Sequence, residues 1–257
     1  MANGGAPGLS VVDRLFTVLE AFAGHRGPLT LVDLGELTGL PKTTLHRVCW
    51  KFVELNVLEH TAEGFQMGSR LYALGAMSPS LRRLRASAMP LLHVLVARSG
   101  WVANLGVLCE HRALVVDEVA GAGQLPPRDR MIGTTMPLYA TALGKALVAN
   151  GPQSLRDELC ASPLLRPYTR HTIVRTSLLR EHLAEVAHRG YAVSNEELQL
   201  GIMGVAAPVI VAGELVGAIA LVGPADDAAP RRLSKHVRLA AGRLAQALSP
   251  AAVELVA

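Results

Sequence analysis

The chain has 257 residues, more than the roughly 100 to 200 of one typical domain, so we expect two domains. No apolar run approaches the ~20 residues that cross a bilayer, and three scattered cysteines without a CxxC pattern argue against disulfides and a zinc knuckle. The formal net charge of +4 allows an anionic partner without requiring one, and we expect a cytoplasmic protein with no membrane partner.

The chain opens on a Gly- and Ala-rich stretch at 1–10, which predicts a flexible tail rather than a signal peptide. An amphipathic helix is predicted at 11–22, where apolar residues recur with a period of about 3.6. After a turn, Thr30 stands three residues before Asp33, an arrangement typical of a helix N-cap. It predicts a second helix at 31–38.

A third helix is predicted at 42–55, because Gly39 ends the helix before it and Pro41 is tolerated at a helix start. Its expected buried face consists of Leu45, Val48, Cys49 and Phe52. The opposite face is short, polar and basic. Strands at 57–60 and 65–67, joined through a turn that contains glycine, then predict a hairpin. Together these are the parts of a winged helix-turn-helix.

Helices are predicted at 69–76 and at 80–98, and Pro90 inside the second one indicates a kink or a break. The second helix begins with three arginines that have no acidic residue close to them in the sequence: Arg82, Arg83 and Arg85. Such a cluster fits either a phosphate contact or a solvated helix face.

Beyond Gly100 the pattern changes to short apolar runs, which predict strands at 102–109, 113–119, 203–211 and 215–222. Helical patterns lie at 141–149, 178–189 and 231–248. The strands arrive as two hairpin-like pairs with helices between and after them. This order favours an α+β domain with an antiparallel sheet over a doubly wound parallel one.

Several motifs in this order resemble the IclR family, named after the isocitrate lyase regulator: LVDLGELTGLPKTTLHR at 31–47, the hairpin, PLYATALGKA at 137–146, GYAVSNEE at 190–197 and GIMGVAAP at 201–208. The resemblance spans residues 11–249. It implies a winged helix-turn-helix joined by a linker helix to a GAF-like effector-binding domain. Such a protein would bind a palindromic double-stranded DNA operator as a homodimer or a dimer of dimers.

A DNA-reading helix needs short hydrogen-bonding and cationic side chains at its N-terminal end, because that end meets the base edges in the major groove. The predicted DNA contacts are Lys42, Thr43, Thr44, His46 and Arg47, with Arg14 of the first helix as a further phosphate contact. Two alternatives stay open. Thr43 or Thr44 caps the helix instead, or Arg47 forms an ion pair with Glu36 or Glu54.

The resemblance also implies one small-molecule cavity in the second domain. Its implied lining is Ala142, Leu143, Ser194, Ile202, Gly204, Ala220 and Val222. Compared with family members that bind small carboxylates, Ser194 replaces an acid, Gly204 a thiol, and Ala220 and Val222 hydroxyls. An apolar pocket would disfavour glyoxylate- or pyruvate-like effectors and favour a larger apolar or aromatic one. Alternatively, these residues are plain core.

An enzymatic function is not expected. Gly144-Lys145 lacks the earlier glycine and the following Ser or Thr of a phosphate-binding loop. Glu196-Glu197, read as strand residues, would point to opposite faces and not converge on one bond. The histidines show no HxxxH or HxH spacing, which leaves only a cavity histidine such as His111 or His171. We therefore expect no catalytic residue, no metal and no cofactor.

The expected organisation is a tail at 1–10, a winged helix-turn-helix at 11–76, a linker helix at 77–98 and an effector-binding domain at 99–250. The expected function is a ligand-responsive repressor of a metabolic operon. The alternative is a constitutive regulator whose C-terminal domain only oligomerises.

Overall fold

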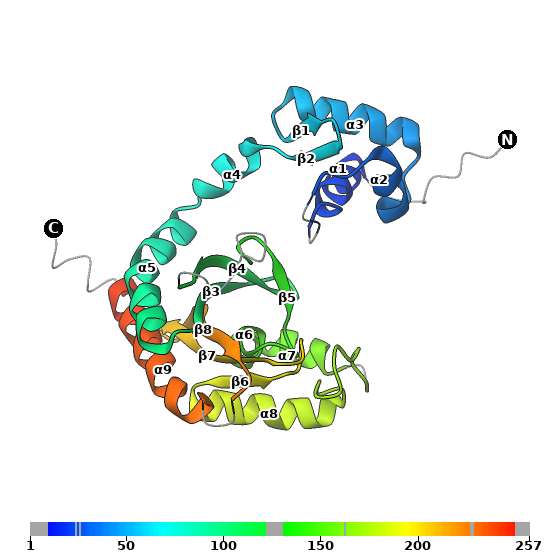
Figure 1. Ribbon diagram of the computed structural model, residues 1–257. Helices are drawn as coiled ribbons and strands as arrows, with labels where there is room; N and C mark the ends of the chain where they lie inside the picture. The colour runs from blue at the N-terminus through cyan, green and yellow to red at the C-terminus, as the bar shows by residue number, and fades with distance from the viewer. Residues whose placement is uncertain are drawn as a thin grey trace. The chain divides into compact units, whose positions relative to one another are not determined.

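The structure is a computed structural model that describes residues 10–23, 25, 27–121, 131–161, 163–226 and 229–249 (Figure 1). The chain divides into two compact units, 1–82 and 83–257. Most of the predicted tail lies outside the described residues. Ser10, however, is the N-cap of the first helix, because its hydroxyl accepts a hydrogen bond from the Asp13 amide at 3.1 Å.

The first unit begins with three helices, a hairpin and a fourth helix: α1 (Val11–Glu20), α2 (Leu31–Thr38), α3 (Lys42–Glu54), β1 (Leu58–Thr61), β2 (Gly64–Met67) and α4 (Ser69–Ala76). Thr30 caps α2 as predicted. Its hydroxyl accepts from the Asp33 amide at 3.2 Å, and the Asp33 carboxylate accepts from the Thr30 amide at 2.8 Å. Gly39 ends α2 in the left-handed conformation, with φ 67°, which glycine adopts without strain.

One hydrophobic core holds this unit together, and its buried members include Val18, Phe22, Leu34, Leu45, Cys49, Phe52, Leu58 and Phe65. The hairpin is tied to the helices through Leu29, whose backbone exchanges hydrogen bonds of 2.7 and 2.9 Å with Phe65. Gly64 makes this approach possible. Its φ is +141°, and a Cβ at this position would lie 2.6 Å from the Leu29 carbonyl oxygen.

The second unit is built on a six-stranded sheet with the order β5-β4-β3-β8-β7-β6, in which each neighbouring pair is antiparallel. Its strands are β3 (Val102–Cys109), β4 (Arg112–Val119), β5 (Thr135–Pro137), β6 (Ala192–Asn195), β7 (Ile202–Val211) and β8 (Glu214–Pro224). The helices are α5 (Pro79–Ser99), α6 (Ala142–Asn150), α7 (Gln153–Leu159), α8 (Thr176–Arg189) and α9 (Ala229–Leu248). The predicted α+β fold class is confirmed.

Two features of this unit differ from the sequence prediction. The elements β5, β6 and α7 were not predicted, because they are only 3, 4 and 7 residues long and too short to show a period. The break considered at Pro90 was wrong, since α5 runs through it to Ser99. Leu92, Leu95 and Val96 are buried in the turns that follow. We attribute the continuity to this burial, which offsets the hydrogen bond that proline cannot donate.

Helices cover both faces of the sheet (Figure 1). Alternate residues of β7 and β8 face opposite sides. Ala206 and Ala220 belong to one core cluster with Leu147 of α6 and Leu183 of α8. On the side away from α6, α9 packs along β7 (Figure 1).

Candidate DNA-binding surface and effector-binding face

The outward face of α3 is exposed as predicted, with Lys42, Thr43, His46 and Arg47 in contact with solvent and Thr44 half-buried. The helix begins after Pro41, and no side chain caps it, so the threonine hydroxyls are not used as caps. Within the described residues, Arg47 forms no ion pair. Glu54 pairs with Lys51 instead, at 2.6 Å. The structure therefore supports neither alternative, although DNA contact by these residues stays a prediction.

Arg14 is exposed on α1, where its Nε donates a hydrogen bond of 3.4 Å to the Ser10 carbonyl oxygen. The guanidinium is thus partly engaged at the start of its own helix. A phosphate contact by Arg14 stays a prediction.

Trp50, which was not among the predicted site residues, links α3 to the hairpin. Its ring centroid lies 4.8 Å from that of His60 on β1 and 5.8 Å from that of Phe65 on β2, the latter edge-on. His46 lies on the same helix face, one turn earlier, 6.2 Å away. Trp50 is 39% exposed, so it fixes the hairpin beside the basic face while still facing solvent. The four-residue spacing between His46 and Trp50 could have indicated that both side chains lie on the same face of the helix.

The predicted effector residues come together on one face of the second unit's sheet. Ser194, Gly204 and Val222 pair across β6, β7 and β8 in a single row. Directly paired residues present their side chains on the same face, and Ala220 lies two residues along β8 from Val222. The helix α6 covers this face through Ala142, because a Cβ at Gly204 would lie 3.1 Å from the Ala142 Cβ.

These residues are not equally placed for binding. Ser194 is buried, and its hydroxyl donates a hydrogen bond of 2.9 Å to the Ala140 carbonyl oxygen. Ile202, at the start of β7, is 37% exposed. Leu143 is buried against β3, where a Cβ at Gly106 would lie 2.5 Å from its side chain. The close approach of α6 to the sheet therefore depends on glycines in two strands.

Two buried polar residues on the same face were also missed. Asn104 of β3 pairs with Ala220 and, on its other side, with Glu118 of β4. With the Asn104 amide in the orientation that satisfies both of its ends, its nitrogen donates a hydrogen bond of 3.2 Å to the Glu118 carboxylate. The same carboxylate accepts a hydrogen bond of 3.3 Å from the Met131 amide. The sequence predicted an apolar pocket without these two residues, because neither of them belongs to a recognised motif.

Lys145 of α6 is fully buried and paired with Glu197, its Nζ lying 2.5 and 2.6 Å from the two carboxylate oxygens. Its Nζ also donates to the Val193 carbonyl oxygen at 3.3 Å. Burial lowers the pKa of Lys145 and raises the pKa of Glu197, and each charge opposes the shift of the other. Lys145 therefore ties α6 to the edge strand β6 through Val193, and to the segment after that strand through Glu197.

The prediction that Glu196 and Glu197 are strand residues was wrong. Strand β6 ends at Asn195, and Glu196 is left-handed with φ 56°, so neither glutamate lies in a strand. Their partners differ, since Glu196 lies 3.3 Å from the half-exposed ring of His171. His111 is likewise at the surface, 3.6 Å from Glu158. Among the residues that the structure describes, no three potential ligands cluster as a metal site.

Two family models cover most of the chain. The model described as bacterial transcriptional regulator IclR C-terminal matches residues 79–249, and the IclR helix-turn-helix domain matches residues 11–62. The chain belongs to the IclR family. It is 30% identical over 212 residues to the transcriptional repressor IclR of Escherichia coli, covering 80% of this chain and 77% of that protein.

Two further proteins are similar to this chain over most of its length. The chain is 31% identical to the glycerol operon regulatory protein of Streptomyces coelicolor over 228 residues, 86% of this chain and 87% of that one. The solved structure of an IclR homologue from Microbacterium hydrocarbonoxydans, complexed with 4-hydroxybenzoate, superposes with a TM-score of 0.81. It shares 27% identity and covers 93% of this chain and 99% of its own. The chain is an IclR-type DNA-binding transcriptional regulator.

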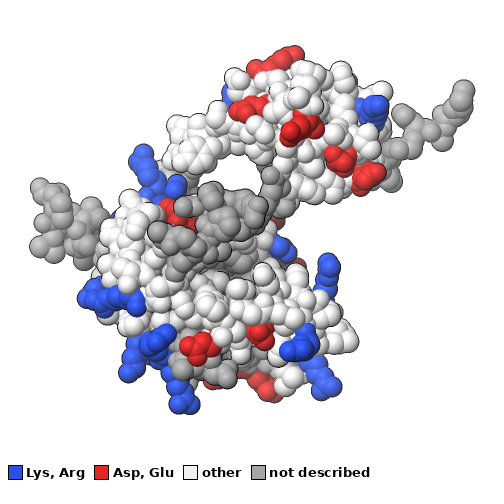
Figure 2. Space-filling view, viewed as in Figure 1, with Lys and Arg blue, Asp and Glu red and all other residues white. Residues whose placement is uncertain are grey.

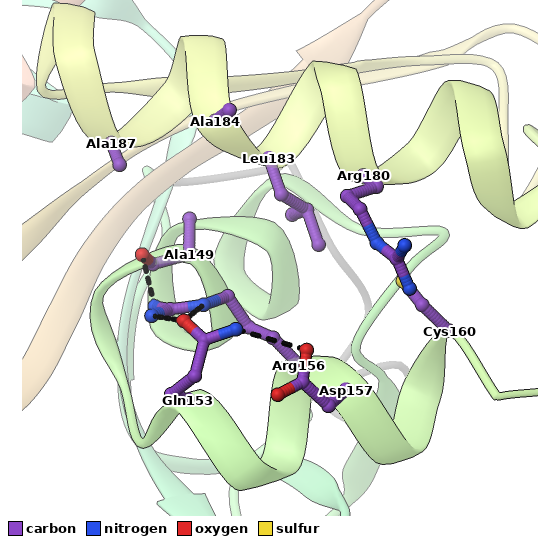
Figure 3. A pocket seen from close by; sticks show the side chains of 9 residues that line it. All are labelled: Ala149, Gln153, Arg156, Asp157, Cys160, Arg180, Leu183, Ala184 and Ala187. Atoms are coloured by element: carbon purple, nitrogen blue, oxygen red, sulfur yellow. Dashed lines mark hydrogen bonds between the residues drawn. The ribbon is translucent and has the colours of Figure 1, made fainter.

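One cavity of this IclR-family regulator, of about 400 Å³, lies between α7 and α8 (Figure 3). Leu183 and Ala149 are among its apolar lining residues. The Arg156 guanidinium donates to the carbonyl oxygens of Ala149 and Gly151 at 2.8 and 3.1 Å, so it joins α7 to the end of α6. None of the seven predicted effector residues lines this cavity. In the described part of the chain, no helix is long and apolar enough to span a membrane.

Proposed function

We propose that this IclR-family regulator represses a metabolic operon and that a small molecule controls its affinity for DNA. The observation that carries the proposal is the outward face of α3, where Lys42 and Arg47 are exposed beside the hairpin and Arg47 has no ion-pair partner among the described residues. Unpaired cations at the start of such a helix suit phosphates and guanine edges. In this proposal the protein binds DNA and a small molecule in the cytoplasm and catalyses no reaction.

The proposed DNA target is a palindromic operator bound by a dimer or a dimer of dimers. One copy of α3 offers only a few base-reading side chains, which is too little for strong discrimination by a single subunit. Footprinting on DNA selected from a random pool tests this. We expect two half-sites separated by about 10 base pairs or a multiple of that spacing. A single unpaired half-site bound with full affinity would contradict the proposal.

The proposed effector is an apolar or aromatic molecule that binds over the sheet face beneath α6. Support comes from the small residues Gly204 and Ala220 on that face and from the 4-hydroxybenzoate in the related Microbacterium structure. The buried Asn104 and Glu118 would add hydrogen bonds for a polar group on the ligand.

Thermal unfolding across a metabolite panel tests the effector. A ligand at a hundred times its dissociation constant adds ~2.7 kcal/mol to the free energy of unfolding. A true effector must also change operator affinity, and Val222→Ser must alter ligand preference towards small acids if Val222 faces the ligand. Micromolar binding of glyoxylate or pyruvate, without binding of aromatic acids, would contradict the proposed effector class.

A constitutive regulator is the second candidate, and a specific observation favours it. Gly204 and Gly106 let α6 pack directly on the sheet, with Ala142 and Leu143 filling the space that a ligand would need. If no metabolite shifts unfolding or operator affinity while the footprint keeps its two half-sites, this candidate replaces the ligand-responsive one.

A further inference from the structure

Charged residues are unevenly distributed along this chain. Of the 25 Lys and Arg residues and 21 Asp and Glu residues in the sequence, α5 and α9 contain many of the former and none of the latter. Their basic residues are Arg82, Arg83, Arg85, Arg98, Arg231, Arg232, Lys235, Arg238 and Arg243. The remainder of the chain is therefore richer in acidic than in basic residues, despite the net charge of +4.

The two helices lie side by side in the second unit. Leu91, Leu95 and Ala240 line one small cavity between them, and Arg83 donates a hydrogen bond of 3.0 Å to the Leu248 carbonyl oxygen. Arg98 of α5 and Arg243 of α9 line the same cavity, so basic residues of the two helices meet at one surface.

One arginine of the cluster at 82–85 forms an ion pair within the second unit. Arg85 pairs with Asp117 of β4 at 2.9 Å, a partner that no sequence proximity revealed. The exposed cations of the cationic face, as we name it, are Arg98, Arg231, Arg232, Lys235, Arg238 and Arg243. Within the described ranges, no ion pair involves any of them. Figure 2 shows Lys and Arg side chains along the edge where Figure 1 places α9.

The packing of α9 turns these cations outward. Its buried positions include Leu233, Val237 and Leu244. Arg231, Lys235 and Arg238 lie on the exposed side at spacings of four and three residues, which makes them neighbours on the helix surface. Like charges at such spacings destabilise a helix unless an anion relieves them. Contact with a second copy through the same face would increase the repulsion.

We infer that the cationic face is a second DNA-contacting surface, which holds the phosphate backbone of duplex DNA without reading its sequence. From Arg231 to Arg243 the stripe is ~18 Å long at 1.5 Å per residue. Duplex DNA carries one negative charge per ~1.7 Å, so several phosphates fit along that length. A uniform polyanion matches a stripe without acidic interruptions, and DNA is the polyanion that an IclR-type regulator meets. The inference rests on that DNA-binding role.

The test uses the full-length protein and a fluorescent random-sequence duplex of about 60 base pairs, titrated between ~50 and ~200 mM KCl. The variant Arg231→Gln, Lys235→Gln, Arg238→Gln removes three cations from the face. The matched control is Arg166→Gln, Arg175→Gln, Arg180→Gln, which removes the same charge from exposed positions elsewhere in the second unit. Anisotropy gives the affinity and its salt dependence.

We expect the first variant to bind more weakly than the control. The slope of log affinity against log salt should fall by ~0.9 for each phosphate that the variant no longer neutralises. Exchanging Lys and Arg at the same three positions should restore both quantities, which separates a missing charge from a folding defect. If the two triple variants have the same affinity and the same salt slope, the inference is wrong. The cationic face is then a solvated surface or a binding site for an acidic protein.

This test of the cationic face can be separated from a test of DNA binding by α3. If Arg47 reads guanine, Arg47→Ala should reduce discrimination between operator and random DNA, while the decrease in salt slope caused by the triple variant should persist in that background. If the triple variant changes operator discrimination instead of the slope, the face does not act as a backbone contact.

Discussion

Arg47 on α3 and Lys145 on α6 show two opposite uses of a basic side chain. Arg47 is exposed and has no ion-pair partner in the described part of the chain, whereas Lys145 is 0% exposed and held by both oxygens of Glu197. An exposed cation stays hydrated, so it carries no desolvation penalty and remains available to a ligand. A cation removed from water requires its partner, so it holds the fold together instead. Removing each charge should therefore affect different measurements.

The largest expected effect is on stability. Glu197→Ala leaves Lys145 buried without a countercharge and should lower the free energy of unfolding of the second unit by about 3 to 5 kcal/mol. Because the chain has two tryptophans, one in each unit, Trp50→Phe lets Trp101 fluorescence report the second unit alone during urea unfolding. The double variant Lys145→Met, Glu197→Leu should lose much less. Equal losses in the single and double variants would show that the uncompensated charge is not the cause.

The second effect is on DNA binding. Arg47→Ala should weaken specific binding by about 1 to 3 kcal/mol if the side chain reads guanine, or lower the salt slope by about 1 if it contacts phosphate. The free energy of unfolding should change by no more than ~0.5 kcal/mol, because the side chain is at the surface. Lys51→Ala on the same helix is the control, since Lys51 already pairs with Glu54. Unchanged binding together with unchanged salt slope would remove Arg47 from the DNA-binding surface.

The third effect returns to the first unit, where a cap positions the helix before α3. Thr30→Ala removes the hydroxyl that accepts from the Asp33 amide, and should cost ~1 kcal/mol of stability. Trp50 fluorescence in a Trp101→Phe background reports it, and Thr30→Ser should recover most of the loss. If Thr30→Ala is as stable as the parent, the capping hydrogen bonds contribute nothing to α2.

The two regions also differ in how far their sequence predicts them. The ends of α2 were predictable because Thr30, Asp33 and Gly39 act within a few residues of each other. The strands β3 and β8 were predictable from apolar runs, although the sheet order, which joins β3 to β8 across more than a hundred residues, was not.

The candidate site follows the same division. The exposed face of α3 follows from helical periodicity, so Lys42 and Arg47 were found. Lys145 and Glu197 are separated by 52 residues in the sequence, and neither belongs to a motif that demands the other. The contact between Asn104 and Glu118 was not predicted for the same reason, because the two residues meet only through the pairing of β3 with β4.

The effect that is smallest at neutral pH, and grows only in acid, concerns His182 on α8, beside the Lys145 pair. Burial, reinforced by the charges of Lys145 and Arg189, lowers the pKa of His182 from 6.5 to about 4. Between these values the unfolded chain binds a proton that the folded chain does not, so the free energy of unfolding falls as the pH drops from 6.5 to 4. His182→Gln should remove this contribution, which lowers the pH dependence of stability in the middle of that window by up to about one proton. Urea unfolding followed by Trp101 fluorescence at several pH values measures it, with His111→Gln at the surface as the control. A variant whose stability falls with acid as steeply as that of the parent would show that another group takes up the proton.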